Sequence, residues 1–231
     1  MVDVVKWVDN AAGRRATKDS SRRAPKRAEI VLAATDAIEE HGLGVNTAQI
    51  AERAGVARPH VYRHFDSKDD LDDEVARYAA SELVARVRPT MVRSGTPAEI
   101  IRGVVAESVG WAGEHPNLYR FMADRQQTKA MHHARLGRNR FLGEIVEASG
   151  AYLRTKEITQ DVPDGIMAGL MGMVDASIIW WLDHKDEQQR EVVERLTRQI
   201  WVVLKDMLEQ LGLSIDDETV LSLPDEGYPS A

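Results

Sequence analysis

One stretch of 23 residues constrains this chain more than any other, running from Asn46 to Lys68 as NTAQIAERAGVARPHVYRHFDSK. Ile50 and Ala51 lie one turn before Ala54, and Gly55 then interrupts the helical pattern. Apolar residues resume at helical spacing, at Val56, Val61 and Phe65. The stretch therefore predicts a helix, a turn and a second helix.

The small residues of this stretch explain its geometry. Two helices that cross at about 90–120° through a short turn need a small side chain at their contact and a residue that accepts a positive φ. Ala51 and Gly55 meet these two needs. The residues left to face outward from the second helix are mainly cations, hydrogen-bond donors and one aromatic ring: Arg58, Pro59, His60, Tyr62, Arg63 and His64. Such a face suits an anionic groove.

The run TAQIAERAGVARPHVYRHFDSKDDL, residues 47–71, resembles the DNA-binding signature of the tetracycline-repressor (TetR) family. In that signature a Thr opens the first helix, AGV forms the turn, and an aromatic-x-His-Phe string precedes x-Ser-Lys. The resemblance implies an all-α protein with an N-terminal three-helix DNA-binding domain and a C-terminal helical domain for ligand binding and dimerisation. Outside these 25 residues the chain resembles the family only in length and helical layout.

Two kinds of DNA contact are expected from this segment. Arg58 and His60, at the exposed start of the second helix, are predicted to reach base edges. An Arg that binds guanine O6 and N7 contributes roughly 1–3 kcal/mol of discrimination. The resemblance implies phosphate contacts, which fix register without reading sequence, from four residues: Thr47, Tyr62, His64 and Lys68. Local packing is the alternative role for Tyr62 and His64.

The segment departs from the family pattern at two positions. Ala57 stands where the family usually has Ser or Thr, so the second helix lacks a side-chain cap worth about 1 kcal/mol. Pro59 fits a first helical turn but has no N–H with which to meet a phosphate. We therefore expect Arg58 to carry more of the contact.

The formal charge of −7 is unevenly distributed. Residues 1–65 hold 11 Lys and Arg against 8 Asp and Glu, a net +3, whereas the remainder carries −10. The basic part is thus the part suited to nucleic acid.

Breaks in composition and periodicity predict four segments. These are a mobile basic arm (1–24), a helix-turn-helix DNA-binding domain (25–67), a helical ligand-binding and dimerisation domain (68–212) and a loosely attached acidic tail (213–231). The arm is suited either to DNA contact or to solubility alone. Capping boxes are predicted at Asn46 with Gln49 and at Ser67 with Asp70, and Thr96, Pro97 and Glu99 are predicted to start a further helix. The predicted helices include 25–41, 68–93, 126–153, 164–184 and 187–211.

The larger domain carries apolar and aromatic residues suited to a small-molecule cavity, with Arg138 or Asp175 as a polar anchor. The candidates are Trp111, Tyr119, Phe121, Met122, Arg138, Met167, Met171, Asp175 and Ile178. Side chains at this spacing are also typical of an ordinary core, and Asp175 has a second possible role in an ion pair across a dimer.

Helices 164–184 and 187–211 are the predicted homodimer interface, because small residues recur along the first of them. These residues are Gly165, Ala168, Gly169, Gly172 and Ala176. Asp175 interrupts the apolar run 165–182, so we expect a covered helix and no membrane span. The N-terminus lacks the apolar core of a signal peptide, and a cytoplasmic location is expected.

The chain has no cysteine, which excludes disulfides and thiolate metal sites. His132 and His133 are adjacent and point about 100° apart on a helix, a poor metal pair. There is no phosphate-binding glycine loop or nucleophile elbow, so no cofactor, metal site or catalytic residue is expected. We expect a homodimeric repressor that binds a palindromic operator and is released by a small, apolar effector. An all-helical enzyme and a dimeric interaction scaffold without specific DNA binding remain the alternatives.

Overall fold

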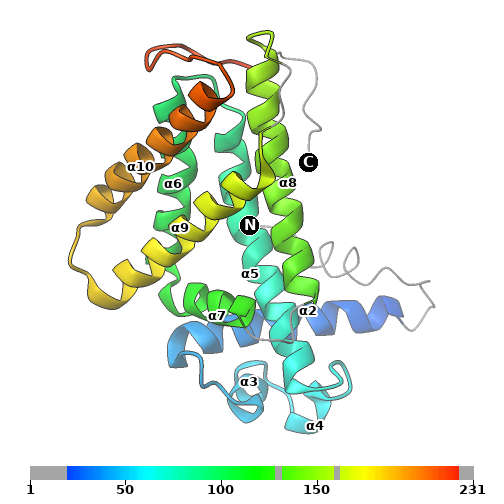
Figure 1. Ribbon diagram of the computed structural model, residues 1–231. Helices are drawn as coiled ribbons and strands as arrows, with labels where there is room; N and C mark the ends of the chain where they lie inside the picture. The colour runs from blue at the N-terminus through cyan, green and yellow to red at the C-terminus, as the bar shows by residue number, and fades with distance from the viewer. Residues whose placement is uncertain (1–19, 128–131, 159–161, 224–231) are drawn as a thin grey trace. The chain divides into compact units, whose positions relative to one another are not determined.

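The computed structural model describes residues 20–127, 132–158 and 162–223, without the side chains of 20–25 and 126–140 (Figure 1). Helices make up this part of the chain, which confirms the predicted all-α class. They are α2 (Ser20–His41), α3 (Thr47–Arg53), α4 (Arg58–Val61), α5 (Lys68–Met91), α6 (Pro97–Glu114), α7 (Pro116–Gln127), α8 (His132–Arg154), α9 (Asp164–His184) and α10 (Gln189–Gln210). The described residues add one isolated antiparallel bridge, between Gly95 and Leu221.

The chain divides into two compact units. Unit 1 takes residues up to Leu83 together with 114–137, and unit 2 takes Val84–Gly113 and the residues from Arg138 onward. Helix α5 begins in unit 1 and ends in unit 2. The domain limits predicted from sequence, at 24, 67 and 212, remain predictions.

Unit 1 is built around α2, which contacts both α3 and α7 (Figure 1). Its buried face carries Ile30, Ala34 and Ile38, which follow one another at four-residue steps and are at most 1% exposed. Ile50 of α3 and Val61 of α4 complete the same core. Apolar residues at helical spacing in α2, α3 and α4 thus form the core of the helix-turn-helix.

Helix α7 is fixed to α2 and α5 at its two ends. The Glu39 carboxylate of α2 accepts hydrogen bonds from the backbone N–H of Asn117 (3.3 Å) and Leu118 (3.0 Å). Near the other end, Arg125 lies 3.3 Å from Asp69 and also pairs with Asp73, both on α5. Charged groups therefore hold α7 within unit 1.

Unit 2 contains α9, α10 and most of α6 and α8, together with the end of α5. An ion pair and a hydroxyl link α8 to α5 within this unit. Arg88 of α5 binds Glu144 of α8 in a two-pronged contact, with nitrogen–oxygen distances of 2.9–3.1 Å. The Tyr152 hydroxyl of α8 donates to the backbone oxygens of Met91 (3.1 Å) and Arg93 (2.6 Å), where α5 ends.

The interpretation of residues 213–231 as a loosely attached tail is wrong for 213–223. Leu221 exchanges two backbone hydrogen bonds with Gly95, of 3.0 and 2.8 Å, and its side chain is buried. Asp217 accepts hydrogen bonds from Trp201 (2.9 Å) and Lys205 (2.8 Å) of α10. The acidic composition of the segment suggested full exposure to water, but two of its apolar residues, Ile215 and Leu221, are buried and attach it to the protein. Residues 224–231 lie outside the described part.

Several predicted helix ends also need correction. Helix α2 begins at Ser20 rather than Pro25, because Arg22, Arg23 and Ala24 are good helix formers that extend it past the proline. Residues 20–24 are therefore helical, and 1–19 of the predicted arm lie outside the described part. The helix predicted over 126–153 begins at His132, since Gln126 and Gln127 belong to α7. The ends of α5 and α10 differ from prediction by one or two residues, as helix ends commonly do.

Candidate nucleic-acid interface

The first helix of the motif, α3, begins with the predicted capping box. The Asn46 side chain accepts from the backbone N–H of Ala48 (2.9 Å) and Gln49 (3.1 Å), and Gln49 Oε1 accepts from the Asn46 N–H (3.0 Å). These bonds satisfy backbone donors that have no partner inside the helix. Ala51, predicted at the crossing, is 3% exposed.

The turn after α3 has the predicted left-handed residue. Gly55 has a φ of 63°, and the following Val56 N–H donates to the Ala51 oxygen at 2.9 Å. A side chain at Gly55 would be strained by this φ, although no atom stands within 4 Å of its Cβ direction. The glycine is therefore required by backbone conformation.

The second helix of the motif, α4, is shorter than the apolar pattern predicted. It runs only from Arg58 to Val61, and turns continue to Phe65 through 2.9 and 3.1 Å backbone bonds to the Val61 oxygen. Ala57 offers no side-chain cap, as expected, and Pro59 lies in the first turn. We call residues Arg58–Phe65 the recognition segment.

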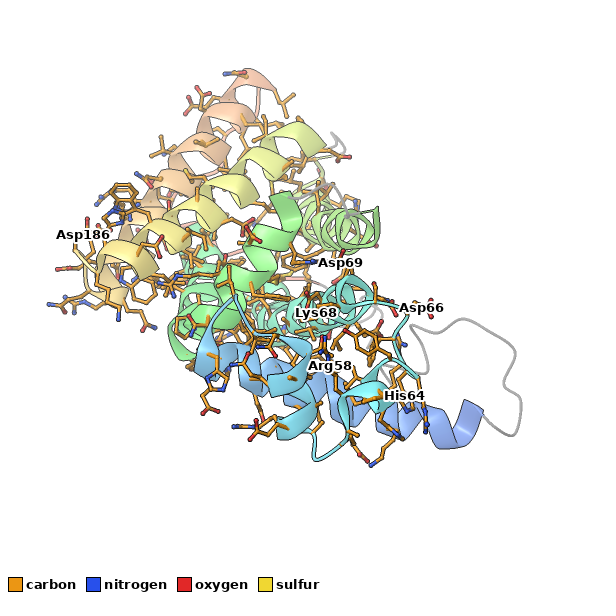
Figure 2. The ribbon with its side chains drawn as sticks, turned by 90° about the horizontal axis from the view of Figure 1, so that it is seen from below. Arg58, His64, Asp66, Lys68, Asp69 and Asp186 are labelled. Carbon is orange, nitrogen blue, oxygen red and sulfur yellow. The ribbon has the colours of Figure 1, made fainter. Side chains whose placement is uncertain are left out.

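The recognition segment buries its apolar residues and leaves its polar ones accessible. Val61 and Phe65 are 1% exposed. Arg58, Pro59, Tyr62 and Arg63 are exposed, while His60 and His64 are half-buried with ring centroids 5.3 Å apart. Figure 2 shows Arg58 and His64 on this segment and Lys68 at the start of α5. The predicted DNA-contacting side chains thus gather at one part of unit 1.

Tyr62 and Thr47 meet across the two helices. Their hydroxyl oxygens are 3.2 Å apart, and the buried Thr47 lies at the first position of α3. Hydrogen bonds from Thr47 and Arg58, aided by the positive charges of Arg58 and Lys68, lower the pKa of Tyr62. The two hydroxyls that are predicted to contact phosphate therefore lie in a positive electrostatic environment, which Arg58 and Lys68 create.

Lys68 is held by an ion pair. Its ammonium lies 2.6 Å from Asp72 one turn later, and the Asp72 side chain is 9% exposed. Burial raises the pKa of Asp72 above its ordinary value, although Lys68 and Arg125 both favour the charged form. For the charged form of Asp72, the desolvation penalty therefore exceeds the stabilisation that Lys68 and Arg125 provide.

A cation that the sequence did not indicate joins three parts of unit 1. The Arg27 guanidinium of α2 donates to the His64 backbone oxygen and, at 3.1 Å, to Glu74 of α5. It also lies 4.2 Å from the centre of the Phe65 ring. The partners are 37 to 47 residues away in the chain, so no local pattern predicts these contacts.

The predicted ligand-binding residues are divided between the units. Tyr119, Phe121 and Met122 are buried in unit 1. In unit 2, Trp111, Met167 and Ile178 are buried, and Met171 and Asp175 are half-buried. The Arg138 side chain lies outside the described part. Their assignment to a ligand stays a prediction, and among the described residues no cluster suits a metal ion.

Helix α9 leaves its small-residue face uncovered within one chain. Gly165, Ala168, Gly169 and Ala176 are exposed, and no atom lies within 4 Å of the Cβ directions at Gly165, Gly169 and Gly172. Trp180, four residues after Ala176, is 56% exposed. Among the described helices, α9 alone is long and apolar enough to cross a membrane, a criterion that helices covered by protein also satisfy.

Residues 30–75 match the family model described as bacterial regulatory proteins, tetR family. A nucleoid occlusion factor SlmA of Vibrio vulnificus (strain YJ016) is 25% identical over 165 residues, which cover 68% of this chain and 84% of that protein. The transcriptional repressor KstR2 of Rhodococcus jostii is 35% identical over 78 residues, 33% of this chain and 38% of that protein.

Solved structures resemble the fold over about three quarters of the chain or more. A tetR-family regulator from Streptomyces coelicolor is similar with a TM-score of 0.65 at 17% identity, covering 80% of this chain and 87% of that one. FadR from Bacillus subtilis, solved in complex with stearoyl-CoA, has a TM-score of 0.57 at 18% identity, covering 76% and 96%. The helix-turn-helix within residues 30–75 thus matches the tetR family of bacterial regulatory proteins, and the fold is similar to that of solved tetR-family regulators.

Proposed function

We propose that this protein is a cytoplasmic, homodimeric repressor that binds a palindromic operator and releases it when a small apolar effector binds. The observation that carries the proposal is the exposed cationic surface of the recognition segment, on which Arg58 lies beside the polarised Tyr62 and Thr47 hydroxyls. The match of residues 30–75 to bacterial regulatory proteins of the tetR family, and the similar fold of a tetR-family transcriptional regulator, support a role in regulation.

Arg58 is the candidate for base recognition, and His60 and Arg63 extend the same surface. Arg58 is exposed at the first position of α4, where a side chain of a recognition helix reaches base edges in the major groove. Thr47, Tyr62, His64 and Lys68 are the candidates for phosphate contacts. Such contacts set affinity and register, whereas Arg58 sets sequence preference.

The dimer is supported by the uncovered face of α9. A face of small residues ending in the exposed Trp180 leaves apolar surface in water unless a second copy covers it. Val202 and Val203 of α10 are also exposed, at 61% and 40%. A two-fold dimer would present two recognition segments to major grooves about 34–36 Å apart, and would require a palindromic operator.

The effector is proposed to be apolar because buried Trp, Met and Ile side chains dominate the candidate ligand residues of unit 2. FadR of Bacillus subtilis has been solved with stearoyl-CoA, so a protein of similar fold accepts a fatty acyl compound. An effector releases the operator only if it binds the DNA-free conformation more tightly. A thermal-shift screen of fatty acyl-CoA, free fatty acids and aromatic compounds, followed by operator release, tests this part. An unchanged melting temperature and no operator release with any of these compounds would contradict an apolar effector.

The DNA-binding part is tested with the duplex that the wild-type protein selects from a random pool. Arg58→Ala should lose preference between that duplex and single-base variants, by roughly 1–3 kcal/mol at the base it reads. Lys68→Ala should weaken all duplexes alike and lower the salt slope by about 0.9 if one phosphate contact is lost. Lys205→Ala on α10 removes the same charge far along the chain and serves as the control.

Three results would contradict this assignment. If the wild-type protein binds no duplex at low salt, an interaction scaffold would be the better assignment. DNA binding unchanged in both Arg58→Ala and Lys68→Ala would move the interface elsewhere. A turnover abolished by His132→Ala, without DNA binding, would favour an enzyme.

A further inference from the structure

The recognition segment is too short to hold its own orientation. Helix α4 has four residues, no side-chain cap at Ala57, and a proline that removes one backbone donor. The turns from Tyr62 to Phe65 are closed by local backbone bonds back to His60 and Val61. Something outside the segment must therefore fix its end.

Arg27 makes the contacts that such a role requires. One nitrogen of its guanidinium donates to the His64 backbone oxygen, and the other donates to Glu74 at 3.1 Å. The plane lies over the Phe65 ring at 4.2 Å, and Asp70 lies 3.8 Å away. A single side chain on α2 thus touches the last two residues of the recognition segment and the first turns of α5.

The energetics favour a specific role over a surface ion pair. The Glu74 side chain is 4% exposed and forms ion pairs with both Arg27 and Arg77. Two guanidinium groups therefore balance its negative charge in a position shielded from water. Arg27 presents a planar fork that donates in two directions while stacking on an aromatic ring, which Lys cannot reproduce. By contrast Lys26, the preceding residue, is paired with Glu29 at the exposed surface.

We propose that Arg27 is a positioning residue for DNA recognition, which sets the orientation of the recognition segment through the His64 carbonyl and the Phe65 ring. The proposal rests on the proposed DNA-binding function. Arg27 acts by placing Arg58 and Tyr62, without itself contacting a base. Loss of Arg27 should therefore reduce the preference for the operator more than it reduces binding to DNA in general.

The experiment compares full-length Arg27→Met, Arg27→Lys and Lys26→Met with wild type, using the duplex selected by the wild-type protein and an unrelated duplex of equal length. Arg27→Met should weaken binding to the selected duplex by about tenfold or more and change binding to the unrelated one by less than about threefold. Arg27→Lys should recover only part of the loss. Lys26→Met should behave like wild type on the selected duplex.

Two further readouts separate positioning from other roles. The amide resonance of Phe65, which shares a peptide unit with the His64 carbonyl, should shift in both Arg27 variants and not in Lys26→Met. A melting temperature close to that of wild type in Arg27→Lys, with reduced operator preference, would exclude simple unfolding. A direct phosphate contact would instead lower the salt slope and weaken both duplexes equally.

The inference and the proposed function fail in different ways. If wild type binds no duplex, the DNA-binding function is wrong. If wild type binds the selected duplex and Arg27→Met binds it as tightly, with an unshifted Phe65 resonance, the role given to Arg27 is wrong.

Discussion

Replacing Glu39 by Ala should lower the free energy of unfolding by about 1–2 kcal/mol. The carboxylate accepts two backbone N–H groups at the start of α7, those of Asn117 and Leu118, at 3.3 and 3.0 Å. The first N–H groups of a helix have no partner inside it. Glu39 on α2 therefore caps a helix that begins 77 residues further along the chain.

The magnitude follows from two contributions. Loss of a side-chain cap costs about 0.5–2 kcal/mol, and a negative charge at a helix N-terminus adds about 0.3–1 kcal/mol at low salt. The half-buried position of Glu39 supports values in the middle of these ranges. The hydrogen bond from the Asn117 side chain to the Glu39 backbone oxygen, 2.9 Å long, persists in the variant and limits the loss.

The measurement is urea unfolding of Glu39→Ala and Glu39→Gln, followed by far-UV circular dichroism. Glu39→Gln should lose about half as much, because its amide oxygen still accepts one N–H while the charge is gone. Glu40→Ala is the matched control, since the adjacent Glu40 forms an exposed ion pair of 2.5 Å with Arg53, worth about 0–1 kcal/mol. Equal losses in Glu39→Ala and Glu40→Ala would refute the capping argument.

Two further predictions concern assembly and pH. Gly172→Glu should be monomeric by analytical ultracentrifugation and should bind DNA weakly. The chain itself should still fold, because no atom lies within 4 Å of the Cβ direction at Gly172. A fully dimeric variant would place the interface elsewhere. Burial, helped by repulsion from Glu82, raises the pKa of Tyr78 to about 12. Because the unfolded phenol ionises near 10, this contribution to stability is intact below pH 10 and is lost between pH 10 and 12. Wild type should therefore lose up to about 2–3 kcal/mol more than Tyr78→Phe over that range in urea melts, and parallel losses would contradict it.

The features that the sequence predicted correctly are those in which cause and effect lie within one helical turn. The box at Asn46 with Gln49 forms as expected, and the helix start predicted at Thr96 and Glu99 has reciprocal bonds of the same kind, with lengths of 2.8 to 3.3 Å across the two sites. The second predicted box, Ser67 with Asp70, is incomplete: Ser67 accepts from the Asp70 N–H at 3.0 Å, but the Asp70 carboxylate accepts from the Asp66 N–H instead. Spacing thus identifies a cap, whereas the backbone entering the helix decides which N–H the side chain meets.

The features that sequence reasoning missed depend on contacts between distant residues. The attachments made by Arg27 and Glu39, like the Gly95–Leu221 bridge, join positions separated by 37 residues or more. An Arg or Glu at a helix surface is usually solvated, so its type gives no sign of a specific partner. Only the packing of α2 against α5 and α7 turns these common surface residues into specific ones.

The short α4 changes how the family's phosphate-contacting positions should be understood here. Tyr62 bonds Thr47 at 3.2 Å, so the same hydroxyl that is proposed to meet a phosphate also ties the recognition segment to α3. Binding to DNA must therefore either keep this bond, with the phosphate accepting from the remaining donor, or break it and lose part of the support for α4. The first arrangement costs less, because a hydroxyl can donate and accept at the same time. Orientation and the proposed phosphate contact would thus depend on one hydroxyl pair, while Arg27 contacts the other end of the segment.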